Sequence, residues 1–179
     1  MASIDESSKQ PESLSAPSPI RPEHDTSDFD CGEPALDDWL RRRALDNESR
    51  FSRTYVVCQA TRVVGYYCIS ASGVERRSVP GKLRRNAPDL VPVAVIGRLA
   101  VSRSHAGRGL GGDLLADALL RIATASDIMG IAAVLVHAKS DAAKNFYLRY
   151  AAFLEFPADS RSLFLPVDRI IAERTPTQR

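Results

Sequence analysis

VAVIGRLAVSRSHAGRGLGGDLLADALL, residues 93–120, contains an apolar strand, a glycine-rich turn and the start of an amphipathic helix in direct succession. A chain that passes from a strand through glycines into a helix presents unpaired backbone N–H groups at the helix N-terminus. These donors, together with the positive end of the helix dipole, stabilise a phosphate group. The glycines of the turn, Gly107, Gly109, Gly111 and Gly112, therefore predict a site for a pyrophosphate.

The segments on either side of this stretch predict one sheet covered by helices. Apolar residues recur at helical spacing after Pro34, at Leu36, Trp39 and Leu40. Residues 53–60 and 63–72, rich in Val, Tyr and Thr, favour an antiparallel hairpin. The later pattern indicates a helix from residue 110 that ends before Gly130, a buried strand at 131–136, a helix at 141–150 and a final strand at 163–167. This order predicts a mixed α/β (α+β) fold.

Composition limits the chain to one folded domain and argues against a membrane span and a metal centre. Its 179 residues, 44% of them hydrophobic, supply enough apolar material for one core. No apolar run reaches the roughly 18 residues of a membrane span, and the acidic N-terminus lacks a signal-peptide pattern, so we expect a cytoplasmic protein without membrane contact. The cysteines and histidines lack metal-ligand spacing, so we expect no metal.

Charge is divided unevenly between an acidic N-terminal segment and a basic body. Residues 1–30 carry two cations and seven carboxylates, a net charge of −5, whereas the whole chain carries +2. Residues 1–27, rich in proline and serine, are predicted to be a disordered tail, followed by a folded domain at 28–168 and a polar tail at 169–179. The basic body indicates a polyanionic partner, with a merely soluble surface as the alternative.

The most basic segment is the predicted loop at residues 73–90, which holds five cations within ten residues. It is longer than a connection between two strands requires, so we predict that it contacts phosphates. The alternative is a mobile, solvated excursion. Its cations are Arg76, Arg77, Lys82, Arg84 and Arg85.

Three motifs together resemble one enzyme family: VIGRLAV at 95–101, GRGLG at 107–111 and NFYLRY at 145–150. Their order and spacing are similar to those of the GNAT family of acetyl-CoA-dependent N-acetyltransferases. FDCG at 29–32 and PGKLRRN at 80–86 further resemble toxins of toxin–antitoxin modules, of the TacT, AtaT and ItaT kind, which acetylate the amino group of aminoacyl-tRNA and stop translation. The resemblance implies the GNAT fold, a mixed central sheet splayed in the middle with helices on both faces.

The same resemblance implies roles for individual residues. Tyr147 matches the family's proton donor to the CoA sulfur, the alternative being a half-buried tyrosine that packs the core. Binding of acetyl-CoA is implied for Leu99, Ala100, Val101, Gly107, Arg108, Gly109, Leu110, Gly111, Gly112 and Ser140. Contacts to tRNA are implied for Arg41, Arg42, Arg76, Arg77, Lys82, Arg84, Arg85 and Arg98, the last of which could instead seal a dimer.

The sequence offers no obvious general base. Acetyl transfer from a thioester to an amine needs a neutral amine, a stabilised oxyanion and a proton for the departing thiolate. No Glu, Asp or His lies at an expected base position, and this fits an α-amine beside an ester, which is largely neutral near neutral pH. His137 at the end of a buried strand could assist through water or could be a core histidine.

The resemblance also implies partners. It suggests an antitoxin with a ribbon-helix-helix DNA-binding domain, and a homodimer of the toxin. Two other functions stay open: acetylation of a small amine or a protein N-terminus, and a catalytically idle module that only binds CoA. Strong inhibition by salt would argue against a small amine, since only a polyanion releases many counterions.

Overall fold

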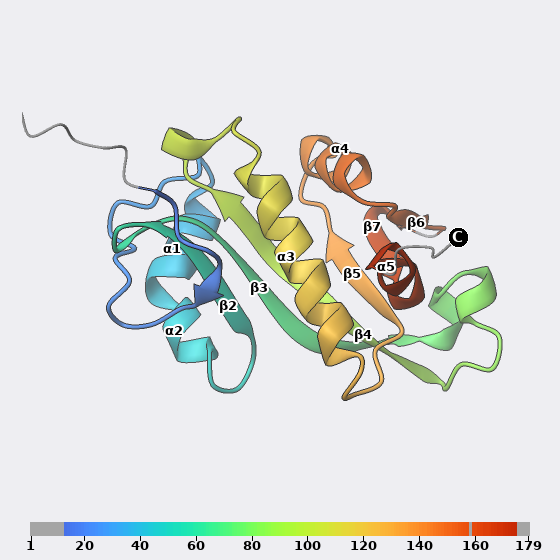
Figure 1. Ribbon diagram of the computed structural model, residues 1–179. Coiled ribbons are helices and arrows are strands. Elements are labelled where there is room, and N and C mark those ends of the chain that lie inside the picture. The colour runs from blue at the N-terminus through green and yellow to red at the C-terminus, as the bar shows by residue number, and fades with distance from the viewer. Residues whose placement is uncertain (1–12, 158, 175–179) are drawn as a thin grey trace, which may run out of the picture.

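The protein forms one mixed β-sheet with helices on both faces, in a computed structural model that describes residues 13–157 and 159–174 (Figure 1). Within these residues the sheet has seven strands in the order β1-β2-β3-β4-β5-β7-β6. All neighbouring strands are antiparallel except β4 and β5, which run parallel. The strands are β1 Ser18–Pro19, β2 Arg53–Gln59, β3 Arg62–Glu75, β4 Leu90–Val101, β5 Ala133–His137, β6 Leu154–Phe156 and β7 Asp159–Pro166. The helices are α1 Pro34–Arg42, α2 Ala44–Asn47, α3 Leu110–Ala125, α4 Asp141–Tyr150 and α5 Val167–Arg174. The predicted mixed α/β fold is confirmed.

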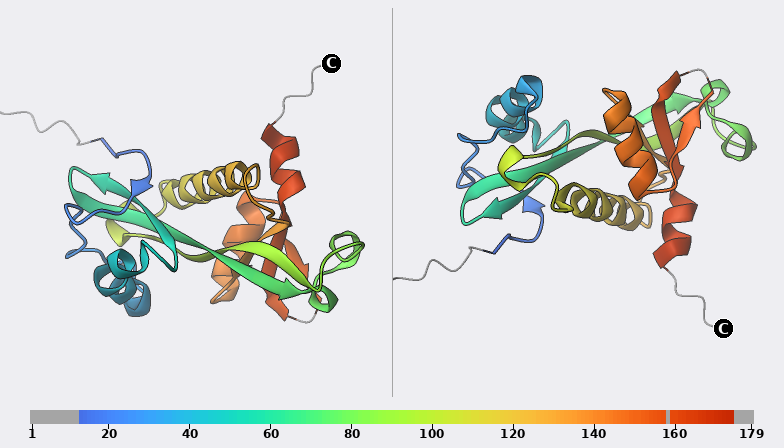
Figure 2. Two further views of the ribbon diagram at one scale, coloured as in Figure 1. Left: turned by 90° about the horizontal axis from the view of Figure 1, so that it is seen from below. Right: turned by 90° about the horizontal axis from the view of Figure 1, so that it is seen from above.

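The helices cover both faces of the sheet, as the views in Figure 2 show. Helices α3, α4 and α5 pack on one side, here called the α3 face, where Leu114, Tyr147 and Ile170 belong to one buried cluster. Helix α1 packs on the opposite side, the α1 face, over the first half of β3, where Leu40 and Tyr66 share a second cluster. Helices therefore cover both faces, as the resemblance implied.

The centre of the sheet is splayed between β4 and β5. These strands pair only through residues 93–95 and 133–135, after which their pairing stops. Strand β4 continues to Val101 along β3 and contains a β-bulge, because Cys68 pairs with Arg98 whereas Ile69 pairs with Ile96, which leaves Gly97 as the extra residue. The bulge and the splay lie at the same level of the sheet.

Residues 13–27 are ordered, contrary to the expectation of a disordered tail at 1–27. Residues 13–27 run along β2: the amide of Ser15 donates to the Cys58 carbonyl at 2.8 Å, and that of Ile20 donates to the Thr54 carbonyl at 2.9 Å. The Ile20 side chain is only 4% exposed. Main-chain pairing and burial of this one apolar residue offset the entropy of ordering, which composition alone did not reveal. Residues 1–12 lie outside the described residues.

Three other boundaries differ from the expectations. The predicted loop at 73–90 is shorter, because β3 extends to Glu75 and β4 begins at Leu90, and it contains 3₁₀ turns at Arg76–Ser78 and Gly81–Leu83. Strand β6 was not predicted. The tail expected at 169–179 begins inside α5, whose Ile170 is buried against the α3 face, and residues 175–179 lie outside the described part.

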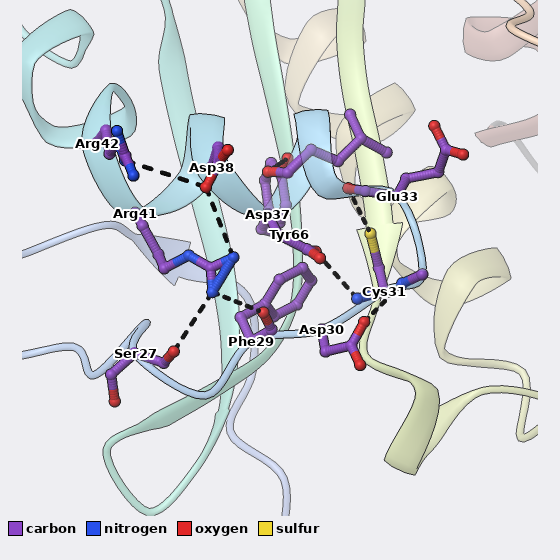
Figure 3. A network of polar contacts seen from close by, with 12 residues as sticks. Ser27, Phe29, Asp30, Cys31, Glu33, Asp37, Asp38, Arg41, Arg42 and Tyr66 are labelled. Atoms are coloured by element: carbon purple, nitrogen blue, oxygen red, sulfur yellow. Dashed lines mark hydrogen bonds and ion pairs between the residues drawn. The ribbon is translucent and has the colours of Figure 1, made fainter.

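Helix α1 is fixed to the sheet by the FDCG segment that precedes it (Figure 3). The buried Asp37 carboxylate accepts a hydrogen bond from the Cys31 amide at 3.0 Å. The Tyr66 hydroxyl of β3 donates to the Leu36 carbonyl at 2.9 Å, and the Trp39 ring stacks on the Tyr66 ring. These bonds hold the N-terminal half of α1 over the central strands.

Candidate active site

The glycine turn between β4 and α3 is open on its outer side. Gly107 and Gly109 have φ angles of 73° and 86°, in the left-handed region that glycine enters without strain. A Cβ at either position would meet nothing within 4 Å. Gly109 is the N-cap of α3, and among the described residues no side chain caps this N-terminus. The first amides of α3, at residues 110–112, are therefore left for a ligand, and this fits an anionic diphosphate.

The two remaining glycines of the turn allow α4 to approach α3. A Cβ on Gly111 would lie 3.2 Å from Cε2 of Phe146, and a Cβ on Gly112 would overlap the Tyr150 ring. Both aromatic rings come from α4, so the end of that helix borders the turn. Arg108 is exposed in the same turn and adds a positive charge next to the amides.

The end of β4 offers an unpaired backbone edge. Leu99, Ala100 and Val101 pair with residues 65–67 of β3 on one side. On the other side, the pairing with β5 has already ended at Val95, so this edge has no strand partner among the described residues. Backbone N–H groups along such an edge can bind amide groups of a ligand or polarise a carbonyl.

Tyr147 is buried on the α3 face, beside the splay. It is 8% exposed, more buried than in the alternative reading of a half-buried core tyrosine, and its ring packs edge-on against Phe146 and Phe153. Burial, and to a smaller extent the nearby Cys68 of β3, raises the pKa of Tyr147 to about 12. Within the described chain no hydrogen bond engages its hydroxyl. The phenol is thus protonated at neutral pH and able to donate.

Ser140 lies at the start of α4, just beyond the splayed end of β5. Its Oγ caps the helix by accepting a hydrogen bond from the Ala143 amide at 3.1 Å. The cap uses a lone pair of the hydroxyl and leaves its proton able to donate. Ser140 therefore has a structural role, and its contact with acetyl-CoA stays a prediction.

A cavity of about 440 Å³ opens on the α1 face and reaches the splay at His137. It lies between β3 and β5 and is closed at one end by β6 and β7. One wall is apolar and the other polar. The apolar wall is formed by Val74, Leu135 and Phe156, and the polar wall by His137, Ser162 and Asp159. Sequence reasoning did not find Ser162 or Asp159, because only the register of β5 with β7 places Ser162 opposite His137.

The predicted tRNA-binding residues fall into two groups at opposite ends of β3 (Figure 1). Arg41 and Arg42 lie on α1, which packs on Tyr66, whereas the loop cations follow Glu75, nine residues or about 30 Å further along the strand. Arg98 lies nearer the first group, with its guanidinium carbon 4.3 Å from the centre of the Trp39 ring. The structure does not gather these residues into one patch.

Several of these cations already have protein partners. Arg76 pairs with Asp89 at 3.1 Å, and Arg77 pairs with Glu75. On α1, Arg41 and Arg42 both pair with Asp38, and Arg41 also donates to the carbonyls of Ser27 and Phe29 (Figure 3). Arg84 and Arg85 are exposed and form no ion pair with a described residue, and Lys82 lies in the turn Gly81–Leu83. The loop therefore presents free cations mainly at its tip.

A polar cluster under α3 was not anticipated from the sequence. The Tyr67 hydroxyl donates to the Asp117 carboxylate, which also pairs with Arg121 at 2.8 Å. Arg121 lies over the Tyr55 ring and donates to the Pro17 carbonyl at 3.1 Å. The cluster joins α3, two strands and the N-terminal segment, which are far apart in sequence.

The described residues contain neither a candidate metal centre nor a helix that could span a membrane. They contain no group of three or more His, Cys, Asp and Glu side chains that could hold a metal ion. None of their helices has both the length and the apolar character that a membrane crossing requires.

The amides that begin α3 suit a diphosphate, and the unpaired edge of β4 suits an amide-containing arm that ends beside a buried phenol. This combination defines a transferase that uses an acyl-coenzyme A. The chain belongs to the GNAT acetyltransferases: the sequence model of the Acetyltransferase (GNAT) family matches residues 15–153.

The chain is also similar to individual toxins of this family. The chain is 46% identical over 152 residues to a tRNA-acetylating toxin of Mycobacterium tuberculosis, an alignment that covers 84% of this chain and 91% of that protein. AtaT complexed with acetyl-methionyl-tRNAfMet has a TM-score of 0.83 at 29% identity, covering 91% of this chain and 100% of that chain. A tyrosine-to-phenylalanine mutant of AtaT bound to the C-terminus of the antitoxin AtaR and acetyl-CoA has a TM-score of 0.76 at 28% identity, covering 91% and 99%.

Proposed function

We propose that this protein is the toxin of a type II toxin–antitoxin system and transfers the acetyl group of acetyl-CoA to the α-amino group of an aminoacyl-tRNA, which blocks translation. Membership of the GNAT family supports the acetyl transfer. The relative named a tRNA-acetylating toxin and the solved complex of AtaT with acetyl-methionyl-tRNAfMet support the acceptor.

The observation that carries the proposal is the place where the basic loop begins. Glu75 and Ser78 both line the cavity that reaches the splay at His137, and the loop continues from there to Arg84 and Arg85. A small amine requires no cationic segment beside its pocket. The 3′ end of a tRNA brings phosphates to the pocket together with the amine, and a cationic loop at the cavity wall matches this charge.

The chain's own groups suffice for the transfer. Bound acetyl-CoA supplies an activated acetyl group whose sulfur leaves as a thiolate. The amides of residues 110–112, with Arg108, hold the diphosphate, and the edge of β4 at residues 99–101 holds the arm and polarises the acetyl carbonyl. The Ser140 hydroxyl donates one further hydrogen bond. Tyr147 gives its phenolic proton to the departing sulfur.

The tRNA is held through its backbone. Arg84 and Arg85, which form no ion pair with the residues that the structure describes, make the main phosphate contacts, together with Lys82. Arg76 and Arg77 add contacts at the loop end of β3, and Arg41, Arg42 and Arg98 add contacts at the end covered by α1. Such contacts position the nucleic acid without reading its sequence, so the choice of aminoacyl-tRNA depends on the pocket that receives the aminoacyl group.

We infer three further properties from the same family membership. The partner is an antitoxin with a ribbon-helix-helix DNA-binding domain whose C-terminal segment binds the toxin, as the structure of AtaT with the C-terminus of AtaR supports. The toxin forms a homodimer. It acts in the cytoplasm, where charged tRNA is found.

Acetyl transfer from labelled acetyl-CoA to a mixture of charged tRNAs tests the proposal. We expect acetyl label on the aminoacyl end of at least one isoacceptor. Tyr147→Phe should lower the rate by about 10²–10⁴-fold, the usual contribution of a general acid. Tyr150→Phe is the matched control, since this tyrosine lies on the same helix, is 47% exposed and should keep the activity.

Two results would overturn the proposed acceptor. Absence of label on every isoacceptor, with salt-insensitive transfer to a small amine or a protein N-terminus, would assign the enzyme to those substrates. Absence of thiol release from acetyl-CoA with any acceptor would leave a module that only binds CoA.

A further inference from the structure

The cavity on the α1 face meets the splay at His137. Pairing between β4 and β5 ends at Val95 and Leu135, and His137 lies two residues further along β5. Continuing that register would set His137 opposite Gly97, the bulged residue of β4. The histidine thus stands where the two strands separate, at the level at which the edge of β4 becomes unpaired.

A chain of hydrogen bonds fixes the tautomer of His137. The Ser162 hydroxyl donates its only proton to the Asp159 carboxylate. Nδ1 of His137 lies 2.7 Å from Oγ of Ser162. Because the hydroxyl proton of Ser162 is directed at Asp159, Nδ1 must donate the hydrogen bond between His137 and Ser162. The neutral imidazole then carries a lone pair on Nε2, on an exposed side chain that lines the cavity.

The Asp159 carboxylate is held in its ionised form. Hydrogen bonds from the Ser162 hydroxyl and from the Arg161 amide hold the pKa of Asp159 below the usual value of an aspartate. An ionised carboxylate accepts hydrogen bonds only, so Ser162 cannot turn its proton toward His137. Glu75 is a further charged residue that lines this cavity, and it pairs with Arg77.

We propose that this cavity is the acceptor site, in which Nε2 of His137 binds the attacking amine and removes its proton while Val74, Leu135 and Phe156 contact the aminoacyl side chain. The inference rests on the proposed function and chooses between the two roles that the sequence left open for His137. His137 is a catalytic residue in this scheme, and Ser162 and Asp159 are positioning residues. Tyr147 on the α3 face and His137 on the α1 face then serve opposite sides of the splay.

The proton balance closes without another reactant. The neutral amine arrives with two protons and donates one as a hydrogen bond to Nε2 of His137. The lone pair on its nitrogen forms the bond to the acetyl carbon, and the C–S bond breaks as the carbonyl re-forms. His137 takes one proton from the nitrogen, which leaves an amide N–H, and Tyr147 gives its proton to the sulfur. Solvent carries the proton from His137 back to the Tyr147 phenolate.

The first test is the tautomer of His137 in the full-length protein without substrates. In ¹⁵N-histidine NMR spectra at a pH where the ring is neutral, we expect the proton on Nδ1. The Ser162→Ala variant should lose this preference. A proton on Nε2 in the wild-type protein would overturn the inference, because no lone pair would then face the cavity.

The second test compares His137→Ala with His24→Ala. His24 lies in the N-terminal segment, where its Nδ1 accepts from the Arg21 amide, so its replacement should leave the transfer unchanged. His137→Ala should lower kcat by about a hundredfold with an unchanged Kd for acetyl-CoA, and added imidazole should restore part of the rate. Imidazole should not rescue Tyr147→Phe. Activity of His137→Ala within about threefold of wild type, or no rescue by imidazole, would contradict a base at this position.

Failure of this inference is distinguishable from failure of the proposed function. If the wild-type protein acetylates charged tRNA and His137→Ala does so equally well, only the base is wrong. If the wild-type protein acetylates no charged tRNA, the acceptor is wrong, and the His137 comparison is repeated with an amino acid methyl ester as the amine. The tautomer measurement depends on neither acceptor.

Discussion

Replacing Gly109 by alanine tests whether the turn before α3 adopts a conformation that glycine alone enters freely. Gly109 has a φ angle of 86°, and a Cβ at this position would meet no atom within 4 Å. The substitution therefore introduces no clash, and its cost is backbone strain. For an L-residue in the left-handed region this strain is about 1–2 kcal/mol.

Gly130 provides the matched control. A Cβ there also meets nothing within 4 Å, and the φ angle of Gly130 is outside the left-handed range. Gly130→Ala should leave the free energy of unfolding unchanged or raise it by about 0.4–1 kcal/mol, because alanine has fewer unfolded conformations to lose. Urea unfolding should therefore separate the two variants by about 1–3 kcal/mol, with Gly109→Ala the less stable.

Gly109→Ala should also bind acetyl-CoA more weakly than Gly130→Ala. If the turn relaxes toward a conformation that alanine tolerates, at least one amide at the start of α3 changes direction. A lost hydrogen bond to a charged group costs about 1.5–3 kcal/mol, so the Kd from isothermal titration calorimetry should rise about tenfold or more. Equal stability and equal Kd values for Gly109→Ala and Gly130→Ala would refute the reasoning, because the left-handed φ would then impose no constraint.

Three other variants probe separate parts of the molecule. Replacing Arg84 and Arg85 together by alanine should reduce the slope of log affinity for tRNA against log salt by about one to two, as fluorescence anisotropy measures, since each removes a phosphate contact; an unchanged slope would exclude the loop tip from the interface. Arg121→Ala should lower the free energy of unfolding by about 1–3 kcal/mol and expose residues 13–20 to proteases, because it breaks the bond to the Pro17 carbonyl and the pair with Asp117; an unchanged proteolysis rate would show that strand pairing alone holds the segment. The raised pKa of Tyr147 means that the folded state keeps a proton that the unfolded chain loses above about pH 10, so stability should fall as pH rises from 10 to about 12, and this part of the fall should be absent from Tyr147→Phe.

Elements with a local signal were predicted well. Helix α4 was predicted at 141–150 and observed at Asp141–Tyr150, and the structure adds that Ser140 is its N-cap. The glycine turn and the strand before it were likewise placed correctly. The N-terminal segment was not, since its order depends on pairing with β2 and on Arg121, about a hundred positions away in the chain.

Some residues of the candidate site lie in local sequence motifs, whereas others come together only through the pairing of strands. The glycines and Tyr147 carry their information in short motifs, and the structure places them around one end of β4. The polar wall of the cavity depends on the register between β5 and β7, which brings Ser162 next to His137 across 25 positions. No local pattern encodes such a register, so the partners of His137 became visible only in three dimensions.

The segment at residues 13–20 also bears on how the protein can be handled. It lies against the outer edge of β2, where Ser18 pairs with Val56 and Leu14 bridges to Gln59. Without it, the main-chain donors and acceptors of β2 would face water and could template a strand from a second molecule. A shortened protein that begins near residue 28, the boundary that composition suggests, would expose the edge of β2 and become prone to aggregation. Expression tags therefore belong before Ser13.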